Sequence, residues 1–280
     1  MNRDLLVFSA VLILAISLVV SGNAFLEAKK AENAPIDENL ELQRALAYGE
    51  IQNVMAAHTY CYEAQKQAYE IENFWSKRDD ISYGAQNVGR EAVINYFVKT
   101  NDAAHKAKLK RMSELYPDEV KNIPENEGIG DMVIHLATTP YIEVAGDCKT
   151  AKGLWYVPSI NVEIDQNGDP VPVTIWEKCD VDFIKEDGKW KIWHFTQWVQ
   201  FAAPLNKSLV DGSFQLSRPF FSPQPLGGQE AGRQPAQQPV DMSQTKSKDQ
   251  AYSTKRVADW RPGLPKPYNT WENLTSEVSK

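Results

Sequence analysis

The pattern of apolar residues changes its period near the middle of the chain, from the spacing of helices to the alternation of strands. Between Leu40 and Ala68, the apolar residues recur as on one face of an amphipathic helix: Leu42, Leu46, Ile51, Val54 and Met55. We expect a second helix over 69–77 and a short strand over 81–84. A third helix is expected to begin at Gly89 and to carry Ala92, Val93, Tyr96 and Phe97.

Alternating apolar and polar positions begin at Asp131 and predict four long strands, over 132–144, 152–165, 171–186 and 189–202. The connections between them contain Gly146-Asp147, Asn167-Gly168 and Asp187-Gly188. The last two are strong hairpin turns because glycine tolerates a positive φ. Helices followed by such a meander predict an α+β fold in which the helices cover one face of an antiparallel sheet.

Two segments lie outside this pattern. Residues 106–127 are charged and contain Pro117 and Pro124, which predicts an insertion or lid between the helices and the sheet. Residues 205–280 are rich in proline and glutamine, with too little apolar surface to offset backbone entropy, so we expect an irregular tail. Its aromatic residues are expected to dock in part on the body or on a neighbouring subunit: Phe220, Phe221, Trp260, Tyr268 and Trp271.

The first 24 residues resemble a secretory signal peptide. The run from Leu5 to Val20 is apolar except for two serines and follows Arg3, and Gly22-Asn23-Ala24 has the small residues of a cleavage site. We therefore expect 1–24 to be a signal peptide removed on export, 25–39 a linker and 40–204 the folded domain. The alternative is an uncleaved signal anchor that holds the protein at the membrane, although the run is short for a span of about 20 residues.

Composition narrows the class of protein. The net charge of −7 and the lack of a basic cluster argue against a nucleic-acid partner. The three cysteines are Cys61, Cys148 and Cys179, too scattered for a disulfide scaffold or a zinc site. Cys148 and Cys179 could pair in an oxidising compartment, or all three could be buried free thiols.

Four stretches of the chain are similar to the SnoaL-like group of the nuclear transport factor 2-like superfamily. They are the segments HTYCY at 58–62, GREAVINYF at 89–97, HLAT at 135–138 and DGKWKI at 187–192. This resemblance spans residues 40–202. It implies a cone-shaped roll of three helices packed on a strongly curved antiparallel sheet, usually paired as a homodimer or small homo-oligomer. Such cones host dehydratases, cyclases, isomerases and noncatalytic binders.

The resemblance also implies candidate catalytic residues. His135 matches the strand histidine that acts as general acid or base in dehydratase-like members, and Tyr60 matches a tyrosine of the cavity that polarises a substrate oxygen. Gln65 stands where many dehydratases carry an aspartate that tunes the histidine. The missing carboxylate could come instead from Asp180, Asp182 or Glu177 on the third strand.

The last strand offers a second candidate histidine. Strict alternation would place Trp190, Ile192 and His194 on one face and Lys191 on the other; because Lys191 should be solvated, His194 would point inward. A bulge would reverse this phase. On the first helix, His58 and Tyr62 share a face that Tyr60 does not, and we expect His58 to lie on the surface or in helix packing. The residues expected to bind substrate are Trp75, Trp155, Tyr156, Cys179, Trp198 and Gln65.

The sequence lacks a phosphate-binding loop, a dinucleotide fingerprint and an HExxH motif, so we expect no cofactor and no metal. The first hypothesis is an exported lyase, dehydratase or isomerase that moves protons by histidine on a hydrophobic, aromatic or polycyclic hydroxylated small molecule. The alternative is a noncatalytic module for ligand binding or assembly, which the absence of the aspartate favours.

Overall fold

The computed structural model describes residues 38–121, 128–165, 168–205 and 261–278. The expected signal peptide and linker therefore lie outside the described residues, except for the last two linker positions, and so does most of the tail. The chain divides into two compact units, 1–42 and 43–280. The description below concerns the second unit. Among the described residues, no helix is both long enough and apolar enough to cross a membrane.

Helices form the first layer, and the break between the first two falls before Gln67, earlier than the boundary expected at 68/69. α2 (Glu38–Glu63) ends before Gln65, whose φ of 56° is left-handed, and α3 (Gln67–Asn73) follows. The third expected helix is α4 (Arg90–Ile94), a π-helical turn η1 (Asn95–Lys99) and α5 (Thr100–Leu115) in succession.

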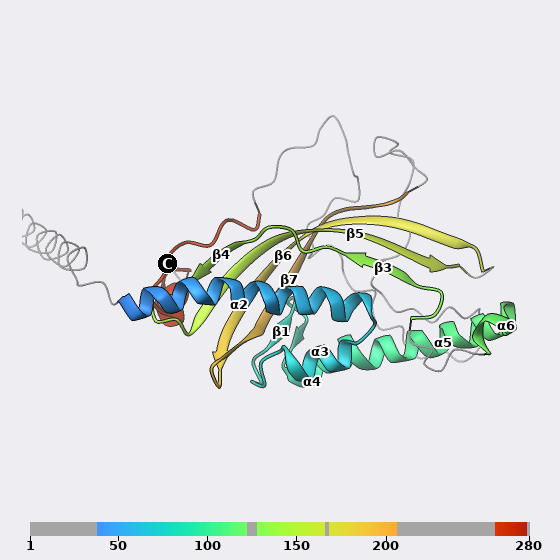
Figure 1. The fold of residues 1–280 in the computed structure, drawn as a ribbon, viewed down its shortest axis with the longest axis horizontal. Coiled ribbons are helices and arrows are strands. Elements are labelled where there is room, and N and C mark those ends of the chain that lie inside the picture. Colours follow the sequence, from blue (N-terminus) through green and yellow to red (C-terminus); the bar gives the residue numbers. More distant parts are fainter. Residues whose placement is uncertain (1–37, 122–127, 166–167, 206–260, 279–280) are drawn as a thin grey trace, which may run out of the picture. The chain divides into compact units, whose positions relative to one another are not determined.

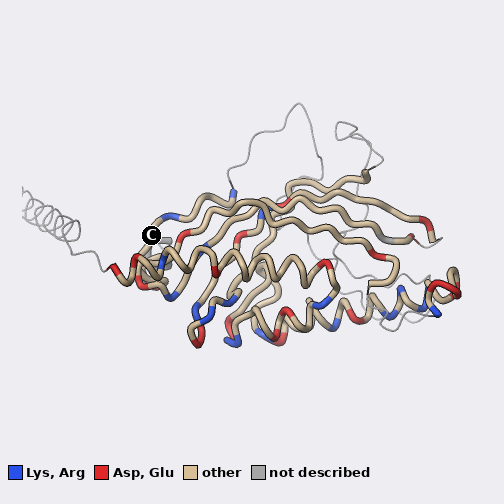
Figure 2. Tube along the Cα trace, viewed as in Figure 1, with Lys and Arg blue, Asp and Glu red and all other residues tan. Residues whose placement is uncertain are grey.

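The charged region expected as an insertion or lid is largely helical. α5 continues to Leu115 and is followed by the short α6 (Pro117–Val120), while residues 122–127 lie outside the description. Figure 2 shows acidic and basic residues interspersed along α5. Its mixed polarity masks the helical period, which is why the pattern alone did not predict a helix there.

A sheet of seven strands forms the second layer. Its order is β2-β1-β7-β6-β5-β3, with β4 also paired to β5. The bounds are β1 (Ser82–Tyr83), β2 (Asn87–Val88), β3 (Met132–His135), β4 (Tyr141–Val144), β5 (Thr150–Ile164), β6 (Pro170–Glu186) and β7 (Lys189–Pro204). The β6–β7 turn places Asp187 and Gly188 at φ of 49° and 75°, as the sequence predicted.

The first long strand of the expected meander is in fact two strands. β3 ends at His135 and β4 begins at Tyr141, and both pair with β5. Pro140 lies in the gap, and proline has no N–H with which to continue the ladder. In the gap, the N–H of Leu136 and the N–H of Thr138 still donate to carbonyls of β5.

Two bulges change which face the side chains of β7 occupy. Asp182 pairs with His194 whereas Phe183 pairs with Ile192, so Trp193 is an extra residue; a second shift falls between Trp176 and Glu177 of β6. We call the sheet face that packs against the helices the inner face. Ile192 is fully buried, but past the bulge Phe195 takes the inner position and packs on the ring of the helix residue His58.

The helices lie on one side of the sheet, as Figure 1 shows for α2, α3 and α4. The strand residues that face them alternate with residues of the opposite face, and the inner residues of β6 are buried: Val173, Ile175, Glu177, Cys179, Val181 and Phe183. The fold is therefore α+β, with a curled antiparallel sheet whose described edges are β2 and β3. All three cysteines are buried and none of them forms a disulfide, so Cys148 and Cys179 do not pair.

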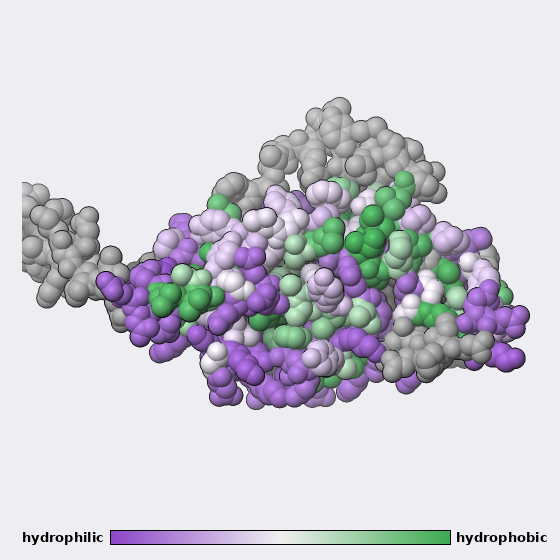
Figure 3. Space-filling view, viewed as in Figure 1, coloured by the Kyte–Doolittle hydropathy of each residue, from purple (hydrophilic) through white to green (hydrophobic). Residues whose placement is uncertain are grey.

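The opposite face of the sheet carries the described part of the tail. The N–H of Gly146 donates to the carbonyl of Tyr268, and Tyr268 is buried with its hydroxyl 3.1 Å from Oγ1 of Thr150. α7 (Trp271–Val278) places Trp271 against Trp193, with ring centroids 4.7 Å apart. Elsewhere the sheet is uncovered by described residues, and Figure 3 shows apolar side chains gathered over β5 beside β3.

Candidate active site

A buried histidine–glutamate pair joins the first two helices of the inner layer. Nδ1 of His58, on α2, lies 2.7 Å from Oε1 of Glu70, on α3. Nε1 of Trp75 donates to the same oxygen at 2.8 Å. All three side chains are nearly inaccessible to solvent. Two donors on one carboxylate oxygen hold the imidazole in a single orientation, with Nε2 directed away from Glu70.

A second buried histidine comes from the sheet. His135 ends β3, and its backbone N–H donates to the carboxylate of Glu63 at the end of α2, at 2.9 Å. In the side chain, Nδ1 lies 2.9 Å from Oγ of Ser159 on β5. Nε2 lies 3.8 Å from Oε1 of Glu177 on β6. The strand, the helix and the neighbouring strand thus fix His135 together.

Glu177 connects His135 to a row of hydrogen-bonded side chains that runs across the inner face. Its Oε1 accepts from Nε2 of Gln197 on β7 at 3.0 Å, and the Sγ of Cys179 lies 3.7 Å away. Tyr83, on β1, donates its hydroxyl to Oε1 of Gln197. The ring of Tyr83 in turn stacks on Tyr96 of the π-helical turn, with centroids 4.9 Å apart.

The two histidines meet in the interior. Their ring centroids are 5.8 Å apart at a steep angle, and Tyr62 contacts the ring of His135 at 4.8 Å. Four buried polar atoms of this group have no hydrogen-bond partner among the described residues: Nε2 of His58, Nε2 of His135, Oε2 of Glu70 and Oε2 of Glu177. Buried polar atoms are nearly always paired, so four unpaired ones in one group indicate a place where a ligand or water binds.

Burial shifts the pKa values of His135 and Glu177, which lie side by side, in opposite directions. It lowers the pKa of His135 to about 3, with a smaller contribution from the charge of His58. It raises the pKa of Glu177 to about 7, against the opposing effect of the hydrogen bonds from Gln197 and Cys179. At neutral pH, His135 is therefore an unprotonated base, and Glu177 is protonated in a large fraction of molecules.

Some of the predicted site residues lie where they were expected, in the interior. His135 is 3% exposed, Trp75 donates a hydrogen bond to Glu70, and the Sγ of Cys179 contacts the carboxyl group of Glu177. Trp155 also occupies the inner face of the sheet, where it packs on Phe183. Its contacts are those of a core residue.

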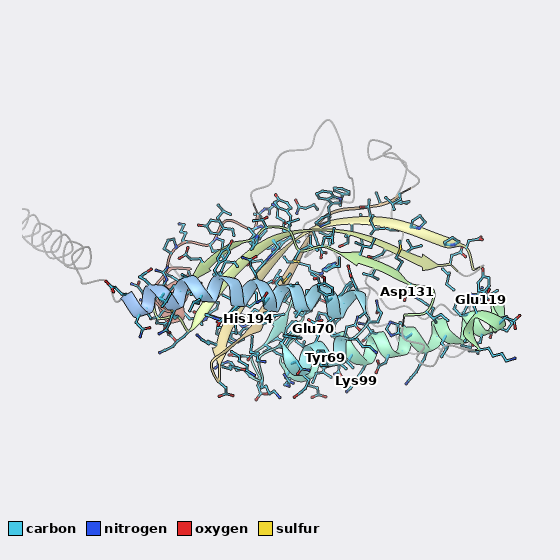
Figure 4. All side chains as sticks on the ribbon, in the orientation of Figure 1. Tyr69, Glu70, Lys99, Glu119, Asp131 and His194 are labelled. Carbon is cyan, nitrogen blue, oxygen red and sulfur yellow. The ribbon has the colours of Figure 1, made fainter. Side chains whose placement is uncertain are left out.

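Four predicted site residues do not face the interior. Tyr60 is 75% exposed on the far side of α2, and Tyr156 is 53% exposed on the outer face of β5. Trp198 pairs with Lys178 on that outer face. His194 also lies there because of the bulge at Trp193, and its Nδ1 contacts Asp182 at 2.9 Å. Figure 4 labels His194 on β7 and Glu70 on α3. The predictions of inward orientation for Tyr60 and His194 are therefore wrong.

Gln65, at the position of the expected aspartate, lies in the turn after α2. Its Oε1 lies 2.9 Å from Nε2 of His105 on α5 and 3.3 Å from Nε2 of Gln67. Its contacts are with α3 and α5, and the carboxylate beside His135 is that of Glu177, one of the three alternatives considered above.

The residue that sequence reasoning missed is His58, which was expected on the surface or in helix packing. A signal was present: Ile51 and Met55 are buried, and His58 continues their stripe at the next helical step. Its partner Glu70 is the one acidic residue of α3 that is fully buried. No sequence pattern distinguishes it from its solvated neighbour Glu72.

The arrangement can move protons. Among the described residues, no group of three or more His, Cys, Asp or Glu side chains has the geometry to hold a metal ion. What the interior offers is a neutral imidazole, a carboxyl group that titrates near neutrality and a second imidazole fixed by a carboxylate, surrounded by aromatic rings.

Comparisons with known proteins found a family model and several solved structures that are similar to this chain. The family model of the SnoaL-like domain matches residues 43–196. Similar solved structures include a type 2 hexachlorocyclohexane dehydrochlorinase, LinA, with 14% identity over 60% of this chain and 95% of that one, at a TM-score of 0.41. A type 3 LinA from Novosphingobium barchaimii LL02 has 15% identity over 60% of this chain and 96% of that one, at a TM-score of 0.39.

A third solved structure is an NTF2-like protein with a cystatin-like fold from Novosphingobium aromaticivorans, with 14% identity over 62% of this chain and 94% of that one, at a TM-score of 0.35. No curated protein matches the chain.

Proposed function

Because the chain belongs to the family of SnoaL-like domains, a family that includes lyases, we propose that it is a cofactor-independent lyase of the dehydratase type, with His135 as its base. The observation that carries the proposal is the pair formed by Nε2 of His135 and the carboxyl group of Glu177, 3.8 Å apart, buried, and each with an atom that lacks a partner. A base and an acid with pKa values moved in opposite directions are what elimination requires.

The reaction balances with these two groups. Nε2 of His135 takes a proton from carbon, and the electron pair of that C–H bond forms the new C=C bond. The C–O bond on the adjacent carbon breaks, and the leaving oxygen takes the proton of Glu177 and departs as water. The imidazolium and carboxylate that remain are 3.8 Å apart, so proton transfer between them restores the starting state.

The substrate class follows from the surroundings of the pair. Tyr62 lies against His135, Phe195 packs on His58, and Trp75 closes the same side of the interior. Aromatic side chains bury flat apolar rings well and offer few polar groups. We therefore propose a hydrophobic, aromatic or polycyclic hydroxylated small molecule as the substrate.

The test compares two histidines of the same sheet. The protein is incubated with a panel of hydroxylated aromatic compounds, and loss of water is followed by mass spectrometry. We expect His135→Ala to reduce turnover by about 100-fold or more, in the range of general acid–base catalysis. His194→Ala, on the outer face, should leave it within about twofold.

Undiminished turnover in His135→Ala would overturn the mechanism. Tight binding of a panel compound, without turnover and without exchange of its carbon-bound hydrogens in heavy water, would instead identify a noncatalytic binding module. That is the alternative favoured by the absence of an aspartate at Gln65.

A further inference from the structure

His58 is placed to take part in the reaction although it does not match any catalytic position implied by the resemblance. It is 2% exposed, its ring centroid lies 5.8 Å from that of His135 in an edge-to-face arrangement, and its Nε2 has no partner among the described residues. Its other nitrogen is held by Glu70, so the free nitrogen has a fixed position. A buried histidine nitrogen without a hydrogen-bond partner is uncommon and calls for an explanation.

The contacts of Glu70 indicate the charge of this pair. Its Oε1 accepts hydrogen bonds from two N–H donors at 2.7 and 2.8 Å, and the residue is fully buried. Two donors stabilise the ionised form of a carboxylate, and a buried anion requires a positive partner at close range. The imidazole of His58 is the group at hydrogen-bond distance that can carry this positive charge. As an imidazolium, it keeps a proton on Nε2 as well as on Nδ1.

We propose that His58 is a further catalytic residue: its imidazolium, held by Glu70, donates the Nε2 proton in a hydrogen bond to the substrate oxygen that gains negative charge when His135 removes a proton from carbon. This inference rests on the proposed function and deepens it. Glu70 is a positioning residue, since it acts through His58.

The electron count of the step remains balanced. The pair from the broken C–H bond forms a C=C bond, and the pair of a conjugated C=O bond moves to its oxygen, which His58 stabilises without giving up its proton. When the C=O bond forms again, the C–O bond of the leaving group breaks and Glu177 supplies the proton that makes water. His58 thus requires a substrate in which an oxygen is conjugated with the carbon that is deprotonated.

The ionisable groups near His58 come from three other elements. They are Glu70 on α3, His135 on β3 and Glu177 on β6, together with Tyr62 on α2 itself. The remaining ring neighbour is Phe195 on β7, which carries no charge. Because His135 is neutral when it acts as the base, the site holds one cation, and an anionic oxygen has one place to bind.

The experiment uses 4-nitrophenolate as a stable mimic of the charged oxygen and 4-nitroanisole as its neutral analogue. Dissociation constants are measured on the full chain by absorbance and calorimetry. We expect His58→Gln to weaken phenolate binding by about 10- to 100-fold, the value of a hydrogen bond to a charged group, and to change the anisole constant by less than about twofold. Glu70→Gln should act in the same direction, and the matched control His194→Gln should change neither.

A second measurement on the parent protein keeps the test decisive if a variant does not fold. Nitrogen-15 NMR of histidine-labelled protein at neutral pH should show both nitrogens of His58 protonated and one nitrogen of His135 protonated. A neutral His58, or phenolate binding that is unchanged in a folded His58→Gln, overturns the inference.

These outcomes separate the two proposals. His135→Ala is expected to lose turnover and keep the binding of phenolate, because His58 is intact. If phenolate binding does not depend on His58 while His135→Ala still abolishes turnover, the inference about His58 fails and the proposed function stands. If turnover survives His135→Ala while phenolate binding depends on His58, the base assignment fails instead.

Discussion

Glu177 is the residue at which stability and chemistry oppose each other. Burial raises its pKa from 4.5 to about 7, so the folded protein binds its proton more tightly than the unfolded chain does. The penalty of a buried carboxylate is therefore absent below about pH 4.5, grows as the pH rises, and is complete above about pH 7. A residue kept only for stability would not be an acid at this position.

We predict that Glu177→Gln makes the protein more stable at alkaline pH. The free energy of unfolding should exceed that of the parent by about 1–3 kcal/mol near pH 8 and match it near pH 4, because the amide has no charge to bury. Urea unfolding at the two pH values measures this. The lowered pKa of His135 gives the free energy of unfolding the opposite pH dependence. Because parent and variant share this residue, its contribution cancels in the difference between them.

The control for this prediction is Glu72→Gln. Glu72 is exposed, and its pKa is lowered by the hydrogen bond from Lys77, so removing its charge gives no gain at high pH. A Glu177→Gln protein that is no more stable than its parent at pH 8 would show that the carboxylate is already compensated in the folded state.

At the scale of single residues, sequence reasoning placed His135 in the interior and did not place His58 there, for a physical reason. The family motif identifies His135 by its position on a strand, and the structure buries it. The resemblance favoured Tyr60 over His58, but orientation on a helix depends on which stripe is apolar, and the stripe through Ile51 and Met55 continues to His58. The partner Glu70 depends on tertiary packing, which no local pattern contains.

At the scale of elements, the long strands were predictable because alternation persists over β5, β6 and β7, and their hairpin turns carry glycine. The split between β3 and β4 and the exact position of the break between α2 and α3 were not, because each depends on one local event: Pro140 in the first case, and the left-handed Gln65 in the second. Periodicity describes the interior of an element better than its ends.

The strand β5 gives a prediction about close packing. A Cβ added at Gly153 would lie 2.3 Å from the ring of Trp155, which is buried against Phe183. We expect Gly153→Ala to lower the free energy of unfolding by about 1–3 kcal/mol, as overpacked cores do, in urea unfolding.

The matched substitution is Gly49→Ala on α2, where an added Cβ meets nothing within 4 Å. It should raise stability by about 0.5–1 kcal/mol, because alanine is the better helix former. Equal effects at the two sites would contradict the packing at Gly153.

At the scale of the whole molecule, the described part of the tail behaves as a component of the folded domain. Tyr268 is 9% exposed and bonds to the sheet through its backbone and its hydroxyl, whereas Leu264 in the same segment is 46% exposed. We predict that Tyr268→Ala lowers the free energy of unfolding by about 3 kcal/mol, the cost of deleting a buried aromatic ring. The control is Leu264→Ala, which should lower the free energy of unfolding by less than about 0.5 kcal/mol in the same thermal or urea unfolding experiment. A similar loss in the two variants would show that the segment is held as a unit rather than by Tyr268.

The extra residue in β7 has a consequence for how such proteins diverge. Trp193 is the single position that separates the inward phase of Ile192 from the outward phase of His194. Loss of the bulge, with Trp193 kept in regular alternation, would exchange the faces of the residues that follow, bringing the imidazole of His194 to the inner face and sending Phe195 out, with the sequence of the strand unchanged. Two descendants could then align perfectly along this strand and yet carry different chemistry in their interiors.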